Sequence, residues 1–499
     1  MTNPTSVPAG AHIGSGTRTT SVPTGIWIGT TATHSSTGAT FPVIDPATEE
    51  VIADVADAAE ADWMAALERA EAARPEWENT APRVRSELLR AIFEEVTRRA
   101  EDFAVAMTCE MGKPYAEALG EVAYGAEYFR WFAEEAVRSH GRLASAPNGN
   151  GTILVTRKPV GTVVAITPWN FPLAMATRKI APALAAGCPV LVKPAAETPL
   201  TLLLLGEVIA EVAQRFGAPD GIVSIIPTTQ AADFSASLMA DPRVKKVTFT
   251  GSTGVGKLLV RQSADNLQRT SMELGGNAPF VVAADADLDL VLTCALQAKM
   301  RNGGEACIAA NRFLVHESIA EEFTARLTEK MAGFTTGHGL DDGTTLGPII
   351  TAKQRDNIAA LVDEALAQGA TATTGGTLVE GKGYFYPATV LIDVPASASI
   401  MHKEIFGPVA AVTTFATNEE AVAAANDTEF GLAAYAFTEN VHTAQYFATH
   451  LQAGMVGINR GAISEPAAPF GGIKQSGFGR EGGTEGIEEY QHVTYVAWT

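Results

Sequence analysis

The chain has 499 residues, of which 46% are hydrophobic and 18% charged, and its formal net charge is −20. This length exceeds what one core usually organises, so we expect two or three domains, and the composition is that of a folded protein. The acidic balance, without any basic run, argues against a nucleic-acid partner, because phosphate contacts require clustered Lys and Arg.

The cysteines and the apolar runs narrow the expected setting. Cys109, Cys188, Cys294 and Cys307 are widely spaced without a CxxC pair, so we expect reduced thiols rather than disulfides or a zinc site. The histidines show no paired spacing, and no metal site is expected. No uninterrupted apolar run reaches the roughly 18 residues of a membrane span, and the N-terminus lacks signal-peptide features. We therefore expect a cytoplasmic protein without a membrane partner.

The N-terminal part divides into three stretches. Residues 1–25 are rich in Thr, Ser and Gly and are expected to form a flexible extension. Short apolar segments between residues 26 and 56 indicate a few strands. From Glu60 to about Arg138 apolar residues recur at helical spacing, which predicts a helical scaffold without catalytic residues.

Two regions of alternating strands and helices follow. This alternation predicts parallel sheets covered by helices on both faces, with ligands bound at the carboxyl ends of the strands. The tail at 489–496 alternates polar and apolar residues like an edge strand, which invites pairing with another chain. In the first region we expect strands at 153–155, 160–166, 190–192, 223–226 and 244–250, with helices at 174–186, 200–216, 231–239 and 256–264. In the second we expect strands at 280–282, 313–315, 388–392 and 409–415, with helices at 288–300, 318–331, 352–368 and 418–426.

Cys307 is the first candidate for chemistry. It follows an apolar-periodic run that ends at Met300 and stands among small and polar residues, so we expect it at an exposed turn after a helix. A thiol in that place can meet a ligand, whereas a free cysteine is more often a small residue packed in a core. The window by itself leaves both interpretations open.

A glycine-rich turn, Gly251 to Lys257, lies between an expected strand and an expected helix, where backbone amides can bind a phosphate. The Walker A pattern nearly fits, but Leu258 stands where a Ser or Thr would hold Mg²⁺, which argues against a nucleotide triphosphatase. The spacing GxGxxG of dinucleotide sites is also absent. The glycines alone therefore indicate a phosphate site of unspecified kind.

Three further polar residues each have an ordinary explanation. Glu273, beside Gly275 and Gly276, could be a surface salt-bridge partner. Asn170, in Pro-Trp-Asn-Phe-Pro, could cap the following helix, and Glu404 could be a solvated turn residue.

Taken together and in order, these segments resemble the aldehyde dehydrogenase superfamily, over about residues 40 to 497. The resemblance implies an α/β aldehyde dehydrogenase fold with a Rossmann-like cofactor domain, an α/β catalytic domain and a small β oligomerisation element. A set of this size in this order is specific, and it favours the nucleophile interpretation of Cys307. The matching segments are PWNFP (168–172), KPAAETP (193–199), FTGSTGVGK (249–257), ELGG (273–276), the Cys307 segment, EIFGP (404–408) and PFGGIKQSGFGREGG (469–483).

The resemblance implies a role for each candidate. The Cys307 thiolate would attack the aldehyde carbonyl, and the Asn170 amide with the Cys307 backbone N–H would hold the oxyanion. Loss of hydride would leave a thioester, and Glu273 would act as general base on the water that hydrolyses it. The cofactor would be bound by Thr167, Pro168, Trp169, Lys193, Ala196, Gly251, Ser252, Gly256, Leu274, Glu404 and Phe406.

The cofactor and the substrate follow from finer matches. Members that favour NAD commonly carry Glu where this chain has Ala196, so NADP is expected, with NAD possible and Glu197 next door as an opposing feature. The succinic semialdehyde dehydrogenase branch grips a distal carboxylate with two arginines and a serine, which match Arg178, Arg301 and Ser464. That branch also often carries a second cysteine at the position of Ala309, so no redox disulfide is expected here.

The resulting expectation is oxidation of succinic semialdehyde by a homodimer or homotetramer. Glutarate semialdehyde or a broad range of aliphatic aldehydes are the alternatives, and a binding protein that keeps the fold without the chemistry is another class. The expected NAD(P)-binding domain spans residues 1–141 and 161–273, the catalytic domain 274–461, and the oligomerisation strands with the C-terminal segment 142–160 and 462–499.

Overall fold

The computed structural model describes residues 10–498, and the chain is already folded at the start of that range. Strands β1 (Ala11–Ser15) and β2 (Arg18–Val22) form an antiparallel hairpin that packs on helix α3. Ile13 and Val22 are buried in the core. The expected flexible extension is therefore wrong for residues 10–25, because these two apolar side chains attach the hairpin to the helices. Residues 1–9 of that extension lie outside the described part.

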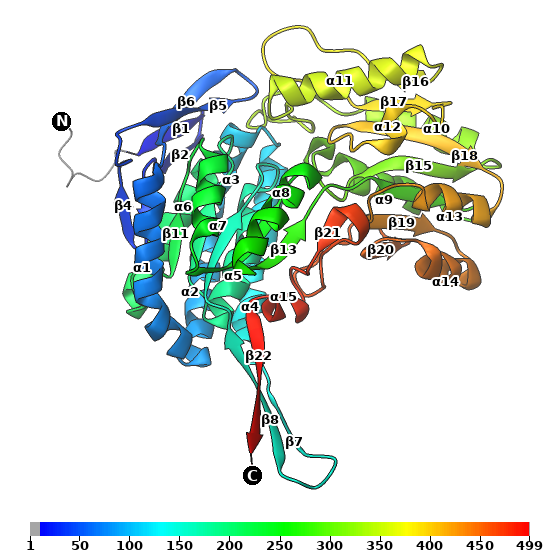
Figure 1. Cartoon of the computed structure of the whole chain (residues 1–499). Coiled ribbons are helices and arrows are strands. Elements are labelled where there is room, and N and C mark those ends of the chain that lie inside the picture. Colours follow the sequence, from blue (N-terminus) through cyan, green and yellow to red (C-terminus); the bar gives the residue numbers. More distant parts are fainter. Residues whose placement is uncertain (1–9, 499) are drawn as a thin grey trace.

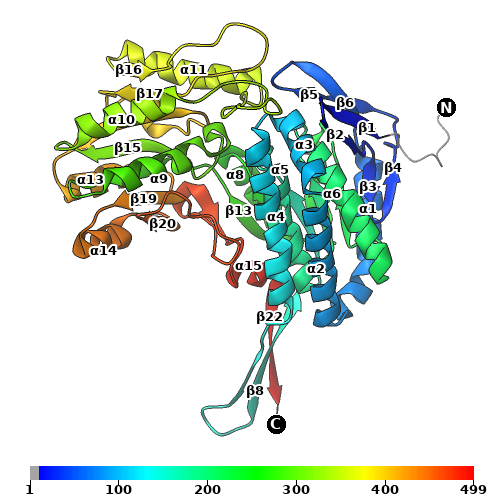
Figure 2. The same ribbon diagram turned by 180° about the vertical axis from the view of Figure 1, so that it is seen from behind.

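Small strands and long helices make up the N-terminal part of the chain, as expected, and two of these strands, β3 and β4, belong to the first large sheet. Helix α4 lies along α2 and α5 (Figure 2), and α5 in turn packs on strands of that sheet. The elements are β3 (Ile26–Ile28), β4 (Thr31–Thr33), β5 (Thr40–Asp45), β6 (Glu50–Ala56), α1 (Glu60–Asn79), α2 (Pro82–Arg98), α3 (Ala100–Met111) and α4 (Tyr115–Ala136).

The first large sheet has the strand order β21-β13-β12-β9-β10-β11-β3-β4 within the described chain. Strands β9 to β13 run parallel, and the order reverses direction at β9, where α/β sheets bind ligands at the carboxyl edge. Its strands are β9 (Thr162–Ile166), β10 (Val190–Lys193), β11 (Val223–Ile225), β12 (Val244–Thr250), β13 (Arg269–Glu273) and β21 (Gly477–Phe478). The connecting helices are α5 (Pro172–Ala186), α6 (Leu200–Phe216), α7 (Ala231–Ala240), α8 (Thr253–Ser263) and the 3₁₀ turn η1 (Ala264–Asn266).

The second sheet has the order β16-β17-β18-β15-β14-β19-β20, and all of it except β16 is parallel. The chain crosses into it directly, because β13 ends at Glu273 and β14 begins at Ala278. Its strands are β14 (Ala278–Val282), β15 (Ala310–His316), β16 (Thr371–Thr374), β17 (Thr389–Ile392), β18 (Val409–Phe415), β19 (Ala433–Phe437) and β20 (Met455–Ile458). Its helices are α9 (Leu288–Met300), η2 (Arg301–Gly304), α10 (Ala320–Ala332), α11 (Ala352–Ala367), α12 (Ser399–His402), α13 (Asn418–Asn426) and α14 (Val441–His450).

A third, small sheet projects from the body (Figure 1). Strands β7 (Arg142–Ser145) and β8 (Thr152–Pro159) form a hairpin, and the C-terminal strand β22 (Gln491–Trp498) pairs with β8. The short helices η3 (Lys474–Ser476) and α15 (Glu485–Glu488) come before β22 in the sequence. The expected strand in the tail is thus confirmed. The division into cofactor, catalytic and oligomerisation domains stays a prediction. Within residues 10–498 no helix is long and apolar enough to cross a membrane.

Candidate active site

Expected cofactor residues and the expected general base lie at the carboxyl ends of four neighbouring strands of the first sheet. Thr167 follows β9, Lys193 ends β10, Gly251 follows β12 and Glu273 ends β13. The loops that begin the second sheet meet this edge, because Cys307 precedes β15 and Glu404 precedes β18. The fold therefore brings segments from both sheets together at one place.

The turn before Cys307 is unusual in its backbone. Asn302, Gly303 and Gly304 have φ values of 55°, 60° and 79°, so three successive residues are left-handed. Two of them are Gly, and Asn tolerates this region better than most residues. On the other side, a side chain at Gly276 would meet the Cys307 carbonyl oxygen at 2.3 Å. The segment with Glu273 therefore passes directly against the cysteine.

Cys307 is partly buried at a narrow cavity, rather than on an exposed turn as expected. Burial raises the pKa of its thiol to about 12, while the Arg178 guanidinium acts in the opposite direction. A thiolate at this position therefore depends on nearby positive charge. Because Cys307 lies in the wall of a cavity, it is neither packed away in a core nor fully exposed.

Asn170 does not cap the following helix. The N-cap of α5 is Phe171, and the first amides of that helix, at Leu173 and Ala174, donate instead to the Glu121 carboxylate. Instead the Asn170 amide nitrogen donates to the Glu305 carbonyl at 3.0 Å, which leaves its second hydrogen for another acceptor. The Asn170 backbone carbonyl accepts from Lys113 Nζ at 2.8 Å and from the Asn302 amide at 2.9 Å. These bonds fix the loop that carries the amide.

Glu273 is not a surface residue, because only 2% of it is exposed. Neither of its carboxylate oxygens has a hydrogen-bond partner. Burial raises its pKa well above the ordinary value, and the nearby Glu481 carboxylate adds to that effect. A buried, unpaired carboxyl group at a cofactor edge is typical of a residue that exchanges a proton.

Glu481 was missed by the sequence interpretation, although it lies in one of the matching motifs. Its carboxylate forms ion pairs with both Arg178 and Lys179, and all three side chains are almost fully buried. Lys179 Nζ also donates to Thr250 Oγ1 at 2.6 Å, and burial lowers the pKa of this lysine. Every residue of α5 is buried, which explains why its charged residues require a buried partner.

The three expected substrate residues line the same cavity as Cys307. Arg178 is fully buried, its guanidinium lies 4.2 Å from the centre of the Phe470 ring, and its Nη1 atom has no hydrogen-bond partner. Arg301 lies over the rings of Tyr124 and Phe171, at 5.2 and 4.9 Å. Ser464 Oγ is hydrogen-bonded to the Tyr124 hydroxyl. The cavity thus has a cationic and hydroxylic lining.

Tyr124 comes from the helical region that we expected to be scaffold only, so that expectation is too narrow. Its aromatic ring and hydroxyl both contribute to the cavity wall. No sequence signal distinguished it, because it occupies an ordinary position in the apolar pattern of α4. Lys113, also from that region, was missed for the same reason.

The cofactor edge fits a dinucleotide in three respects. The N-cap Ser252 of α8 makes no side-chain cap bond, so the first amides of that helix are open to a phosphate. Gly256 leaves room for Leu274, since a side chain there would meet Leu274 Cδ2 at 2.4 Å. Lys193 is buried with a single carbonyl partner, Pro194, and burial lowers its pKa to about 8.

The remaining cofactor candidates surround this edge. Glu404 is not a solvated turn residue: it accepts from the Gly276 amide at 3.1 Å, and burial raises its pKa to about 7. Trp169 and Phe406 meet edge to face at 5.2 Å between ring centres. Thr167 donates to the Lys193 carbonyl, which joins the ends of β9 and β10. Pro168, Gly251 and Ala196 lie in the same loops, with Ala196 partly buried and Glu197 exposed. Among residues 10–498 no cluster suited to a metal ion occurs.

Comparisons with known proteins agree with this geometry. The sequence model of the aldehyde dehydrogenase family matches residues 33–496. A succinate-semialdehyde dehydrogenase from Paenarthrobacter nicotinovorans is 54% identical over 446 residues, which is 89% of this chain and 98% of the relative. A glutarate-semialdehyde dehydrogenase from Pseudomonas putida is 43% identical over 92% of this chain and 94% of its own length.

The solved structures give the same result. The crystal structure of an NADP-dependent enzyme from E. coli superposes with a TM-score of 0.92 at 40% identity, covering 95% of this chain and 98% of that one. The expected fold class and the resemblance stated from the sequence are both confirmed. The chain belongs to the aldehyde dehydrogenase family.

Proposed function

We propose that this protein oxidises succinic semialdehyde to succinate, with NADP as hydride acceptor. The observation that carries the proposal is the cavity beside Cys307, where Arg178 and Arg301 meet Ser464. A planar guanidinium matches a carboxylate, and two of them offset the acidic field of a chain with net charge −20. The relative at 54% identity bears the name of this activity.

The charge balance of the cavity supports an anionic substrate. Glu481 is shared between Arg178 and Lys179, so one carboxylate faces two cations. Arg301 adds a further positive charge that lies over two aromatic rings, with the Glu117 carboxylate near enough to attract it. The buried Nη1 of Arg178 also has no acceptor. A substrate carboxylate would supply both the missing charge and the missing acceptor.

The covalent steps of the proposed reaction follow from the residues around the cavity at Cys307. The Cys307 thiolate adds to the aldehyde carbon, and the second Asn170 N–H with the Cys307 backbone N–H stabilises the oxyanion, a donor of this kind being worth roughly 3 kcal/mol. NADP held by Lys193, Glu404 and the amides at Ser252 would supply the two-electron oxidant for that carbon. Glu273 then removes a proton from water as the water attacks the Cys307 thioester, which releases succinate and restores the thiol.

The cofactor residues support NADP over NAD. Lys193 and Glu404 would hold the two riboses, the open amides at Ser252 would hold the pyrophosphate, and Thr167, Pro168, Trp169, Gly251, Gly256, Leu274 and Phe406 would line the cleft. At Ala196 no carboxylate repels a 2′-phosphate. The E. coli structure described above is that of an NADP-dependent enzyme.

Glutarate semialdehyde is the second candidate. It carries the same two functional groups one methylene further apart, and a relative at 43% identity bears that name. A single methylene changes binding by only about 1–3 kcal/mol. Both acids are therefore compared in the test.

Self-association and a cytoplasmic location belong to the same proposal. Strand β22 and the β7–β8 hairpin expose Leu143, Val493, Tyr495 and Trp498, each more than half exposed. Such a surface supports a homodimer or homotetramer, which light scattering would measure. The four cysteines are free, which suits a reducing compartment.

The test is NADPH or NADH formation with succinic semialdehyde, glutarate semialdehyde and butanal, each with NADP and with NAD. We expect kcat/KM for succinic semialdehyde to exceed that for butanal about a hundredfold or more, with NADP preferred. Equal rates with the charged and the uncharged aldehyde would contradict the substrate proposal. A preference for NAD would contradict the argument from Ala196.

A further inference from the structure

Three hydroxyl groups form a chain that ends at the cavity. Tyr128 and Tyr124 lie one turn apart on α4, and their hydroxyl oxygens are 2.7 Å apart. The Tyr124 hydroxyl is in turn hydrogen-bonded to Ser464 Oγ, on a loop far away in the sequence. Ser464 and Tyr124 line the cavity, whereas Tyr128 is fully buried behind them.

Counting protons gives this chain a direction when an anion is bound. Each hydroxyl has one hydrogen to donate. If Ser464 donates its hydrogen to a substrate carboxylate, it can take part in the bond with Tyr124 only as an acceptor. Tyr124 must then donate to Ser464, and it can accept in turn from Tyr128. An anion in the cavity therefore aligns all three hydroxyls toward itself.

We infer that Tyr124 is a positioning residue for recognition of the substrate's distal carboxylate. Its hydroxyl holds Ser464 as a donor to the carboxylate, and Tyr128 completes the chain behind it. Hydrogen bonds aligned in series strengthen one another in a low-dielectric interior. This inference deepens the proposed function and rests on it, because it concerns how the same cavity selects an acid-bearing aldehyde.

The ring and the hydroxyl of Tyr124 have separate tasks. The ring face lies under the Arg301 guanidinium and keeps that cation at the cavity wall. The hydroxyl is hydrogen-bonded to Ser464 and Tyr128. Tyr124→Phe removes the hydroxyl and keeps the ring, so it tests the hydrogen-bond chain without disturbing Arg301. Tyr128→Phe makes the same chemical change four residues along the helix, away from the cavity.

The experiment measures kcat/KM of the full-length enzyme for succinic semialdehyde and for butanal. We expect Tyr124→Phe to lower kcat/KM for succinic semialdehyde about tenfold, mainly through KM, and to change that for butanal less than about twofold. Tyr128→Phe should cause a smaller loss with the semialdehyde. The thermal midpoint serves as the folding control for each variant.

A double-mutant cycle tests the path through Ser464. Because Tyr124 acts on the substrate through Ser464, Tyr124→Phe in a Ser464→Ala background should add little further loss. Additive losses would overturn the inference, as would equal losses for both substrates in Tyr124→Phe. If the unmodified enzyme did not prefer the semialdehyde, the proposed function would fail. If it did, and Tyr124→Phe kept the full preference, only the present inference would fail.

Discussion

The cavity at Cys307 is much smaller than a pocket at the outer end of the second sheet, but its side chains are better suited to chemistry. The outer pocket has a volume of about 780 Å³, whereas the cavity at Cys307 measures about 20 Å³, room for about one water molecule. Admitting a four-carbon acid therefore requires side chains around Cys307 to move apart. Size alone would select the wrong site.

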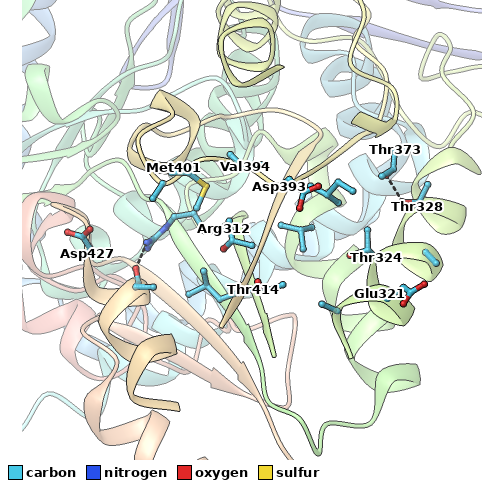
Figure 3. A pocket seen from close by; sticks show the side chains of 18 of the residues that line it. Arg312, Glu321, Thr324, Thr328, Thr373, Asp393, Val394, Met401, Thr414 and Asp427 are labelled. Atoms are coloured by element: carbon cyan, nitrogen blue, oxygen red, sulfur yellow. Dashed lines mark hydrogen bonds between the residues drawn. The ribbon is translucent and has the colours of Figure 1, made fainter. Parts of the chain in front are cut away.

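The outer pocket lies beside the ends of several strands of the second sheet, and Figure 3 shows the side chains that line it. Strands β17 and β18 pair only as far as Leu391 and Ala411 and then separate, which leaves an opening bordered by α10 and α13. Its buried cation, Arg312, donates to the carbonyls of Asn277, Ala424 and Ala425. The hydrogen-bond donors of this guanidinium are thus taken up by backbone carbonyls.

The outer pocket and the Cys307 site differ in whether their buried polar side-chain atoms have hydrogen-bond partners. No polar side-chain atom that lines the outer pocket is buried without a partner in the described chain. At the Cys307 site, by contrast, Arg178, Glu273 and Asn170 all have buried atoms without one. Leaving such atoms unpaired costs about 1–3 kcal/mol each, which is a cost that a ligand can remove. Chemistry therefore identifies the site better than volume does.

The largest expected effect is at the nucleophile. Cys307→Ala should lower dehydrogenase turnover by at least about a thousandfold, because no other thiol lies on the cavity wall. NADPH formation measures it, and retained NADP binding, followed by fluorescence, shows that the fold persists. Substantial turnover in this variant would place the reaction elsewhere.

The general base comes next. Glu273→Gln should slow steady-state turnover about a hundredfold while keeping an initial burst of NADPH, because only thioester hydrolysis needs the base. Since burial raises the pKa of Glu273, the unmodified enzyme should gain activity as pH rises and the carboxyl group loses its proton. Loss of the burst together with turnover would contradict this assignment.

The third effect is expected at Arg301, which we propose binds the carboxylate of the substrate. Arg301→Gln should lower kcat/KM for succinic semialdehyde about a hundredfold and change that for butanal little. Arg326→Gln removes the same charge from the surface of α10 and should affect neither substrate. Arg178 is less suitable for this test, because its removal alters the ion pairing of the buried Glu481 carboxylate.

Much of the fold could be predicted from local patterns. The helices at 200–216 and 418–426 and the strand at 409–415 begin and end where the periodicity predicted. In these segments one apolar period dominates and turn residues stand at both ends. The prediction of a flexible extension was wrong because two apolar residues, Ile13 and Val22, suffice to attach a short hairpin to the core. The local sequence does not show that this core lies beside them.

The candidate site was predictable only where its residues stand in compact motifs. Cys307, Glu273 and Asn170 belong to loops that the fold brings together, and their roles stay predictions that the variants above test. Tyr124 and Lys113 stand in helices with ordinary periodicity, and their contact with the site depends on how α3 and α4 pack. Such long-range contacts leave no trace in local spacing.

A smaller effect is expected at Glu305, two residues before Cys307. This carboxyl group is 1% exposed and accepts one bond, from the Ile350 amide at 3.3 Å. Burial raises its pKa well above the ordinary 4.5, so as pH rises from 4.5 the unfolded chain loses the proton while the folded chain keeps it. Stability from this group therefore falls with rising pH. Glu305→Gln should raise the thermal midpoint more at pH 9 than at pH 6, and an equal change at both would contradict the argument.

The smallest effect is expected in the outer pocket. Thr328→Val removes the hydroxyl that bonds Thr373 across the pocket mouth at 2.6 Å, an exposed contact (Figure 3). Such a surface change is worth about 0.5 kcal/mol or less, and it touches no residue of the Cys307 cavity. Both kcat/KM values should stay within about twofold of the unmodified enzyme. A selective loss with succinic semialdehyde would mean that the larger pocket does communicate with the reaction, and unsatisfied polar atoms would then be an insufficient guide to function.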